Sequence, residues 1–211
     1  MKYNMKKILM LFIAVALSLS VSAKSMREVW ISMPDSIIPY LDKNLRMELI
    51  DFIDMKVKAE VKNKLDENTE IDVFSDNYVS IRLNGSSQMQ IKLLPSKVGD
   101  SLLCMVRTFN GPEQESEIEF YSQGWKRLDS YNIDLNKFIP SMVVKPDTMS
   151  QSKFDELREK MYPVMVNATL LQNEDYLILQ LTSPILFKDE KMQLKPILLQ
   201  RKLKWNSERF N

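Results

Sequence analysis

The sequence has no histidine, one cysteine (Cys104) and four glycines among 211 residues. Without histidine, the commonest general base and the imidazole metal ligand are missing. A single cysteine excludes an intrachain disulfide and a cysteine-rich zinc site. So few glycines leave no Gly-rich phosphate loop of the Walker or dinucleotide kind. These absences favour a protein that is not an enzyme and needs no metal or cofactor. The remaining enzymatic alternative is a hydrolase that uses paired carboxylates.

The N-terminus has the three parts of a secretory signal peptide. It begins with the lysines Lys2, Lys6 and Lys7. An apolar run over 8–17 follows, and then small residues up to Ala23. The run has about half the roughly 20 apolar residues of a membrane span. We therefore expect cleavage after Ala23, a mature chain in the periplasm or cell envelope, and no transmembrane segment in that chain.

The charge of the mature chain is close to balanced. The whole sequence has 29 basic and 28 acidic residues, and removing the three signal lysines leaves 26 against 28, a net charge of −2. A balanced chain has no general electrostatic attraction for nucleic acid or anionic membranes. Neither is expected as a partner.

The first part of the mature chain is expected to be helical. A short helix over 27–32 should end before Pro34, because the residue preceding a proline avoids the helical region. A longer amphipathic helix is predicted over 45–65, with Asn44 as its N-cap and acid-first pairs such as Asp54–Lys58 on its surface. Its apolar positions recur at helical spacing: Leu49, Ile50, Ile53, Val57, Val61 and Leu65.

The hydrophobic period then changes to two. Residues 79–83 and 89–93 alternate on either side of Asn84-Gly85, which predicts an antiparallel hairpin. Further strands are predicted over 101–109 and around 117–121. Residues 24–131 are therefore expected to form helices followed by an antiparallel meander with one buried face.

A second helix-plus-strand region is predicted after a polar stretch. Residues 132–148, with Pro140 and Pro146, are expected to be a linker. Over 149–211 we predict a helix with a capping signal at Ser152, followed by strands over 164–171, 176–182 and 197–205. The expected fold class is α+β: antiparallel meander sheets packed by helices, possibly two tandem helix-plus-sheet modules.

The two regions share a local pattern. Residues 76–83 align with 174–181 at an offset of 98, with the order acid, polar, Tyr, aliphatic in both. Either the chain contains an internal duplication, or a common hairpin pattern occurs twice independently.

The candidate binding residues lie after the last strand of the first region. Trp125 follows Gly124 at a turn, close to Tyr121, Lys126 and Arg127. Aromatic residues and arginine are enriched at protein interfaces, so these four are predicted as interface candidates. In the alternative interpretation, Trp125 folds back to cover the end of the sheet.

Two other features allow different interpretations. Four alternating glutamates form either a site for a cation or basic partner, or a solvated face that protects a sheet edge: Glu113, Glu115, Glu117 and Glu119. Cys104 shares its strand face with Leu102 and Val106, which is typical of a small buried hydrophobe rather than a reactive thiol.

Two segments, 26–36 (MREVWISMPDS) and 49–56 (LIDFIDMK), resemble an exported Bacteroidales family known only as a domain of unknown function. The resemblance covers nearly the whole mature chain. It implies export and a bacterial source, and it implies no activity or site.

Two functions are carried forward. The first is a non-enzymatic interaction module of the periplasm or cell envelope whose partner is another envelope protein. Its helix-plus-meander pairs resemble the sheets of β-lactamase-inhibitor-like proteins, which is an analogy at the level of the fold. The alternative is a periplasmic carrier of a lipid or other apolar ligand. In a carrier, the aliphatic faces of 79–93 and 177–181 would line a continuous apolar cavity of about several hundred Å³.

Overall fold

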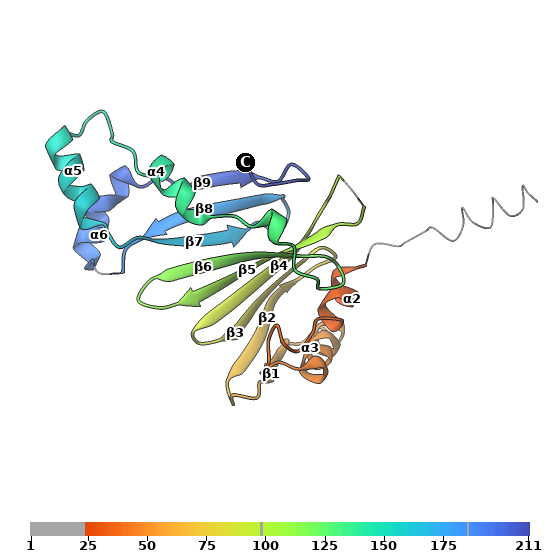
Figure 1. Ribbon diagram of the computed structural model, residues 1–211. Helices are drawn as coiled ribbons and strands as arrows, with labels where there is room; N and C mark the ends of the chain where they lie inside the picture. The colour runs from red at the N-terminus through yellow and green to blue at the C-terminus, as the bar shows by residue number, and fades with distance from the viewer. Residues whose placement is uncertain (1–23, 98, 185) are drawn as a thin grey trace, which may run out of the picture.

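The computed structural model describes residues 24–97, 99–184 and 186–211. The predicted signal peptide at 1–23 lies outside the described residues. The predicted fold class is confirmed: the chain is α+β, with two antiparallel sheets of neighbouring strands and helices packed on them (Figure 1). Among the described residues, no helix has the length and apolar character needed to cross a membrane.

The larger sheet follows two helices and has six strands in sequence order. The helices are α2 (Met26–Ile31) and α3 (Lys43–Asp54). The strands are β1 (Glu60–Lys62), β2 (Asn68–Phe74), β3 (Tyr78–Asn84), β4 (Ser87–Leu94), β5 (Leu102–Asn110) and β6 (Gln114–Tyr121).

The smaller sheet has three strands: β7 (Met165–Leu170), β8 (Tyr176–Thr182) and β9 (Arg201–Lys204). Short helical segments connect the two sheets: η1 (Asp129–Tyr131), η2 (Leu135–Phe138), α4 (Ile139–Met142) and α5 (Gln151–Lys160). Two more, α6 (Lys188–Leu194) and η3 (Lys195–Ile197), lie between β8 and β9.

The helix predicted over 45–65 is only partly correct. α3 ends at Asp54, and Lys56 has a φ of 56°, in the left-handed region that stops a helix. Val61 instead lies in β1 and pairs with Thr69, whereas Val57 and Leu65 are exposed. Asp42, not Asn44, is the N-cap of α3. The expected Asp54–Lys58 pair is absent, and Asp54 binds Arg27 on α2.

Each face of the larger sheet is covered by different parts of the chain. Odd-numbered residues of β3 and β4, such as Val79, Ile81 and Ile91, pack beneath α2 and α3. Even-numbered residues of β5 and β6, such as Cys104 and Phe120, pack against the smaller sheet and its helices. Both aliphatic faces that a carrier would need are therefore filled by the chain itself.

The C-terminal predictions are largely confirmed. Phe154 and Leu157 form the buried side of α5, and Met161 at its C-cap is buried with them. The N-cap is Ser150 rather than Ser152. The strands predicted over 164–171 and 176–182 correspond to β7 and β8. The predicted strand over 197–205 shortens to β9, because η3 occupies its start. Nothing in the sequence analysis predicted α6.

Residues 132–148 pack against the core although a linker was predicted there. The main-chain N–H of Leu199 donates to the carbonyl of Met142 at 2.8 Å, and that of Val144 donates to Ile197 at 2.9 Å. Met142 is fully buried in the core formed between the two sheets. Both predicted regions thus contribute to one core, and a duplication of 76–83 at 174–181 stays a prediction.

The edge of the smaller sheet lies on the face of the larger one. On the side of β7 that does not pair with β8, the main-chain N–H of Ala168 donates to the hydroxyl of Ser116 on β6 at 3.0 Å. The main-chain N–H of Leu170 donates to the side-chain amide oxygen of Gln90 on β4 at 2.9 Å. Because unpaired peptide groups on an edge strand need partners when they are buried, these polar side chains fix how the two sheets meet.

Candidate functional site

The chain makes a tight turn directly after β6. Ser122 N donates to the carbonyl of Lys126 at 2.9 Å, and Trp125 N donates back to the carbonyl of Ser122 at 2.9 Å. Trp125 has a φ of 63°, which is uncommon for a residue with a large side chain. This strained backbone turns the Trp125 ring inward.

The Trp125 ring covers the end of the larger sheet. Its side chain is 7% exposed, and its indole N–H donates to the carbonyl of Val29 on α2 at 3.0 Å. The ring lies 5.4 Å from that of Tyr121 at an angle of 54°. The structure therefore places Trp125 as the alternative interpretation describes.

Tyr121 is buried as well, and it is linked to an acid on its own strand. Its hydroxyl donates to the carboxylate of Glu119 at 2.9 Å. Burial, together with this hydrogen bond to Glu119, raises the pKa of Tyr121 to about 12. Tyr121 and Trp125, the two aromatic candidates, are thus both buried beneath the turn.

Lys126 and Arg127 are the accessible members of the predicted group. Arg127 binds the carboxylates of Glu119 at 2.7 Å and Asp129 at 2.9 Å. The charge of Glu119, followed by the hydrogen bond to Asp129, raises the pKa of Arg127. Lys126 is exposed to solvent at the tip of the turn. A binding role for these four residues stays a prediction.

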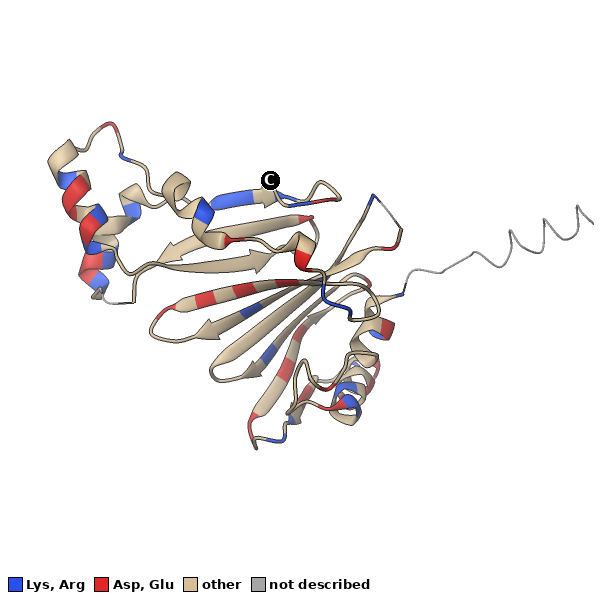
Figure 2. Cartoon of the chain, viewed as in Figure 1, with Lys and Arg blue, Asp and Glu red and all other residues tan. Residues whose placement is uncertain are grey.

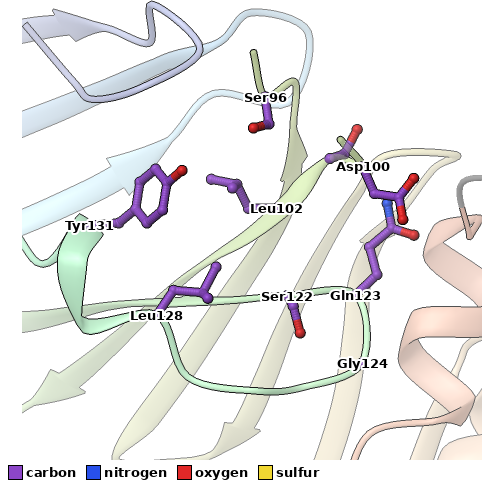
Figure 3. Close-up of a pocket in the computed structure, with 9 residues that line it drawn as sticks. Ser96, Asp100, Leu102, Ser122, Gln123, Gly124, Leu128 and Tyr131 are labelled. Atoms are coloured by element: carbon purple, nitrogen blue, oxygen red, sulfur yellow. The ribbon is translucent and has the colours of Figure 1, made fainter. Parts of the chain in front are cut away.

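A pocket of about 350 Å³ lies beside this turn (Figure 3). Its lining comes from the loop before β5, the turn after β6, and η1: Ser96, Asp100, Ser101, Leu102, Ser122, Gln123, Gly124, Leu128 and Tyr131. Hydroxyls, one carboxylate and one amide line it together with the apolar side chains of Leu102 and Leu128. Figure 3 shows the side chains of Asp100 and Gln123 pointing toward one another at its edge.

Gln123 connects this pocket to the start of the described chain. Its side-chain oxygen accepts from Lys24 N at 2.7 Å, and its main-chain carbonyl accepts from the Lys24 ammonium at 3.3 Å. The first contact fixes which end of the amide carries the oxygen. Its Nε2 is then left buried without an acceptor among the described residues.

The carboxylates and the cysteine of this region bear on the chemistry considered from the sequence. Asp100 is the one carboxylate in the pocket lining, so the lining has no carboxylate pair of the kind that glycosidases use. Cys104 is fully buried, and desolvation raises its thiol pKa, so it matches the predicted inert hydrophobe. Among the described residues, no group of three or more acids, cysteines or histidines is placed to hold a metal.

Asp100 and Gln123 were missed by sequence reasoning. They are separated by the two strands β5 and β6 in the sequence. Gln123 stood next to the aromatic group that drew attention, but an isolated glutamine in a turn gives no signal of its burial.

The comparisons with known proteins identify a family and a fold. No curated protein matches the chain. One similar solved structure is that of a domain of an uncharacterized protein from Porphyromonas gingivalis W83, with 22% identity and a TM-score of 0.71. The alignment covers 90% of this chain and 98% of that one, which supports the fold alone. A family model described as "Protein of unknown function (DUF3256)" matches residues 18–210. The resemblance to a family of unknown function is thus confirmed, and the chain belongs to the DUF3256 family.

Proposed function

We propose that this protein is an exported, non-enzymatic interaction module of the periplasm or cell envelope that binds another envelope protein through its surface. The observation that carries the proposal is the burial of the two aliphatic faces that a carrier would need, one on the larger sheet and one on the smaller sheet. Val79, Ile81 and Ile91 on one face are fully buried under α2 and α3. Leu177 and Leu179 are equally buried in the core between the sheets.

This packing favours a surface binder over a carrier. A carrier of lipid keeps a large part of its sheet face free to line a cavity. Here the same aliphatic residues contact the protein's own helices and sheets. A partner would then be recognised by exposed groups such as Lys126 and Arg127.

Site-specific photo-crosslinking tests the proposal. A photoreactive residue replaces Lys126, and the exported protein is irradiated in intact cells of its native source. A matched control carries the same residue at Lys153, an exposed lysine on α5. We expect one saturable protein adduct from position 126 and none from position 153. Identical adduct patterns from both positions, or no adduct from either, would contradict the proposal.

A further inference from the structure

β6 is one of the two outer strands of the larger sheet. Among the described residues, main-chain groups on its free side are hydrogen-bonded at its two ends. At the C-terminal end, Leu128 N donates to the carbonyl of Phe120 at 2.8 Å. At the N-terminal end, the hydroxyl of Thr182 donates to the carbonyl of Gln114 at 3.3 Å. The chain after the turn thus begins to pair with β6 at Arg127 and leaves it beyond Leu128.

Between these two hydrogen bonds, Ser116 and Ile118 point their main-chain N–H and C=O groups away from the sheet. Alternate residues of a strand point their N–H and C=O groups to the same side. Since Gln114 and Phe120 face outward, Ser116 and Ile118 do as well. In the described part of the chain, no other segment hydrogen-bonds these four main-chain groups from that side.

A groove of about 520 Å³ opens at this point. One wall is the β6 segment 116–119, and the other is the segment 132–136, which passes the strand without pairing with it. Ile133 and Leu135 on the far wall are half-buried against the core. The groove therefore offers a free strand edge beside a partly apolar wall.

The charge of the groove is acidic. Its lining holds three acids (Glu117, Glu119, Asp134) and one base (Arg127), a net charge of −2. Arg127 is bound by Glu119. Glu117 is exposed and forms no ion pair with any described residue. Arg107, opposite Glu117 in the ladder, donates instead to the carbonyl of Ile37 at 2.9 Å. Figure 2 shows the acids following one another along β6.

We propose that an extended, lysine- or arginine-containing segment of a partner protein adds to β6 as a further strand at Ser116–Glu119. Main-chain hydrogen bonds to Ser116 and Ile118 would hold it, as in other cases of strand addition. A basic side chain of the segment would pair with Glu117. This inference rests on the proposed binding function and names the partner chemistry and the contact surface.

The first test uses the mature chain, residues 24–211, labelled with ¹⁵N. The probe is a synthetic peptide that alternates lysine and valine. We expect it to shift the amide signals of Ser116 and Ile118 and to slow their hydrogen exchange about tenfold, as new hydrogen bonds protect them. A peptide with glutamate in place of lysine should leave both signals unchanged. An equal response to both peptides, or shifts that spare Ser116 and Ile118, would overturn the inference.

Two matched variants sharpen the test. Glu117→Lys reverses the charge of a groove residue, whereas Glu115→Lys makes the same change at an exposed residue on the same strand face outside the groove lining. Neither side chain is buried, so both variants should keep the wild-type melting temperature. We expect the basic peptide to bind about tenfold more weakly to Glu117→Lys and within about twofold of wild type to Glu115→Lys. Equal binding by the two variants would overturn the inference.

The photo-crosslink at position 126 separates this inference from the proposed function. If Glu117→Lys removes the native adduct, the partner uses the β6 groove. If the adduct persists in Glu117→Lys, strand addition at β6 is wrong while the binding function stands. If neither variant nor wild type gives an adduct, the binding function itself fails.

Discussion

Lys92 on β4 and Asp175 in the turn between β7 and β8 form an ion pair of 3.3 Å that joins the two sheets. The Lys92 side chain is 1% exposed, and its ammonium also donates to the carbonyls of Leu171 at 2.7 Å, Gln172 at 3.1 Å and Glu174 at 2.6 Å. A buried charge is tolerated only when it is this fully paired. The lysine thus fixes the β7–β8 turn to the face of the larger sheet.

Replacing Lys92 with methionine should be strongly destabilising. The change keeps the apolar stem but removes the charged donor shared by the carbonyls of Leu171, Gln172 and Glu174. Losing these charge-assisted hydrogen bonds should cost about 3 kcal/mol. Urea unfolding measures the effect. Lys97→Met is the matched control, since Lys97 pairs with Glu208 at an exposed site and should cost less than about 1 kcal/mol. Equal midpoints for the two variants would show that Lys92 does not join the sheets.

Trp125 should contribute to folding rather than to binding. Trp125→Phe keeps most of the ring packing but removes the donor to the Val29 carbonyl, and we expect a loss of about 1–3 kcal/mol in the free energy of unfolding. Lys126→Ala, one residue away and exposed, should leave stability within about 0.5 kcal/mol of wild type. Thermal and urea unfolding compare the two. A stable Trp125→Phe protein that had lost its crosslinked partner would reverse this assignment.

The burial of Tyr121, together with its hydrogen bond to Glu119, predicts that stability falls at alkaline pH. The folded-state pKa of Tyr121 is raised to about 12, above its unfolded value of about 10, so the folded state holds the proton more tightly. The stabilisation is fully present below pH 10 and is lost as the pH rises from about 10 to 12. Tyr121→Phe should therefore lower stability at pH 7, with the gap to wild type closing across that window. Urea unfolding at a series of pH values measures the gap, and a constant gap would refute the assignment.

Cleavage after Ala23 would make Lys24 the first residue of the mature chain and give it a free α-amino group. Lys24 N already donates to the buried side chain of Gln123. Intact-mass analysis of the protein recovered from a bacterial periplasm should correspond to residues 24–211. A mature chain that begins at any other residue would contradict the predicted cleavage site.

Much of the fold could be predicted from local pattern. The hairpin at Asn84-Gly85 and the β8 strand both follow from strict alternation, and both are found. The helix over 45–65 was overextended, because Val57, Val61 and Leu65 satisfy helical spacing by coincidence while β1 pairs with β2. Pairing between strands is a tertiary effect, which a helical pattern in one segment does not reveal.

The candidate site was located less well than the fold. Composition drew attention to 121–127, but the direction of the Trp125 ring depends on its left-handed backbone and on the carbonyl of Val29, which is 96 residues away in sequence. The alternating glutamates of β6 are visible as a pattern in the sequence. Its open edge depends on where Leu128 and Thr182 stop pairing with it, and only the folded chain shows that.

The most direct test of the central claim is native mass spectrometry of the mature protein purified from a bacterial periplasm, with solvent extraction of anything bound. Because the aliphatic faces of both sheets are filled by the protein's own side chains, we expect the mass of residues 24–211 alone. A stoichiometric apolar adduct, recovered in the extract, would contradict the surface-binding account and identify the protein as a carrier.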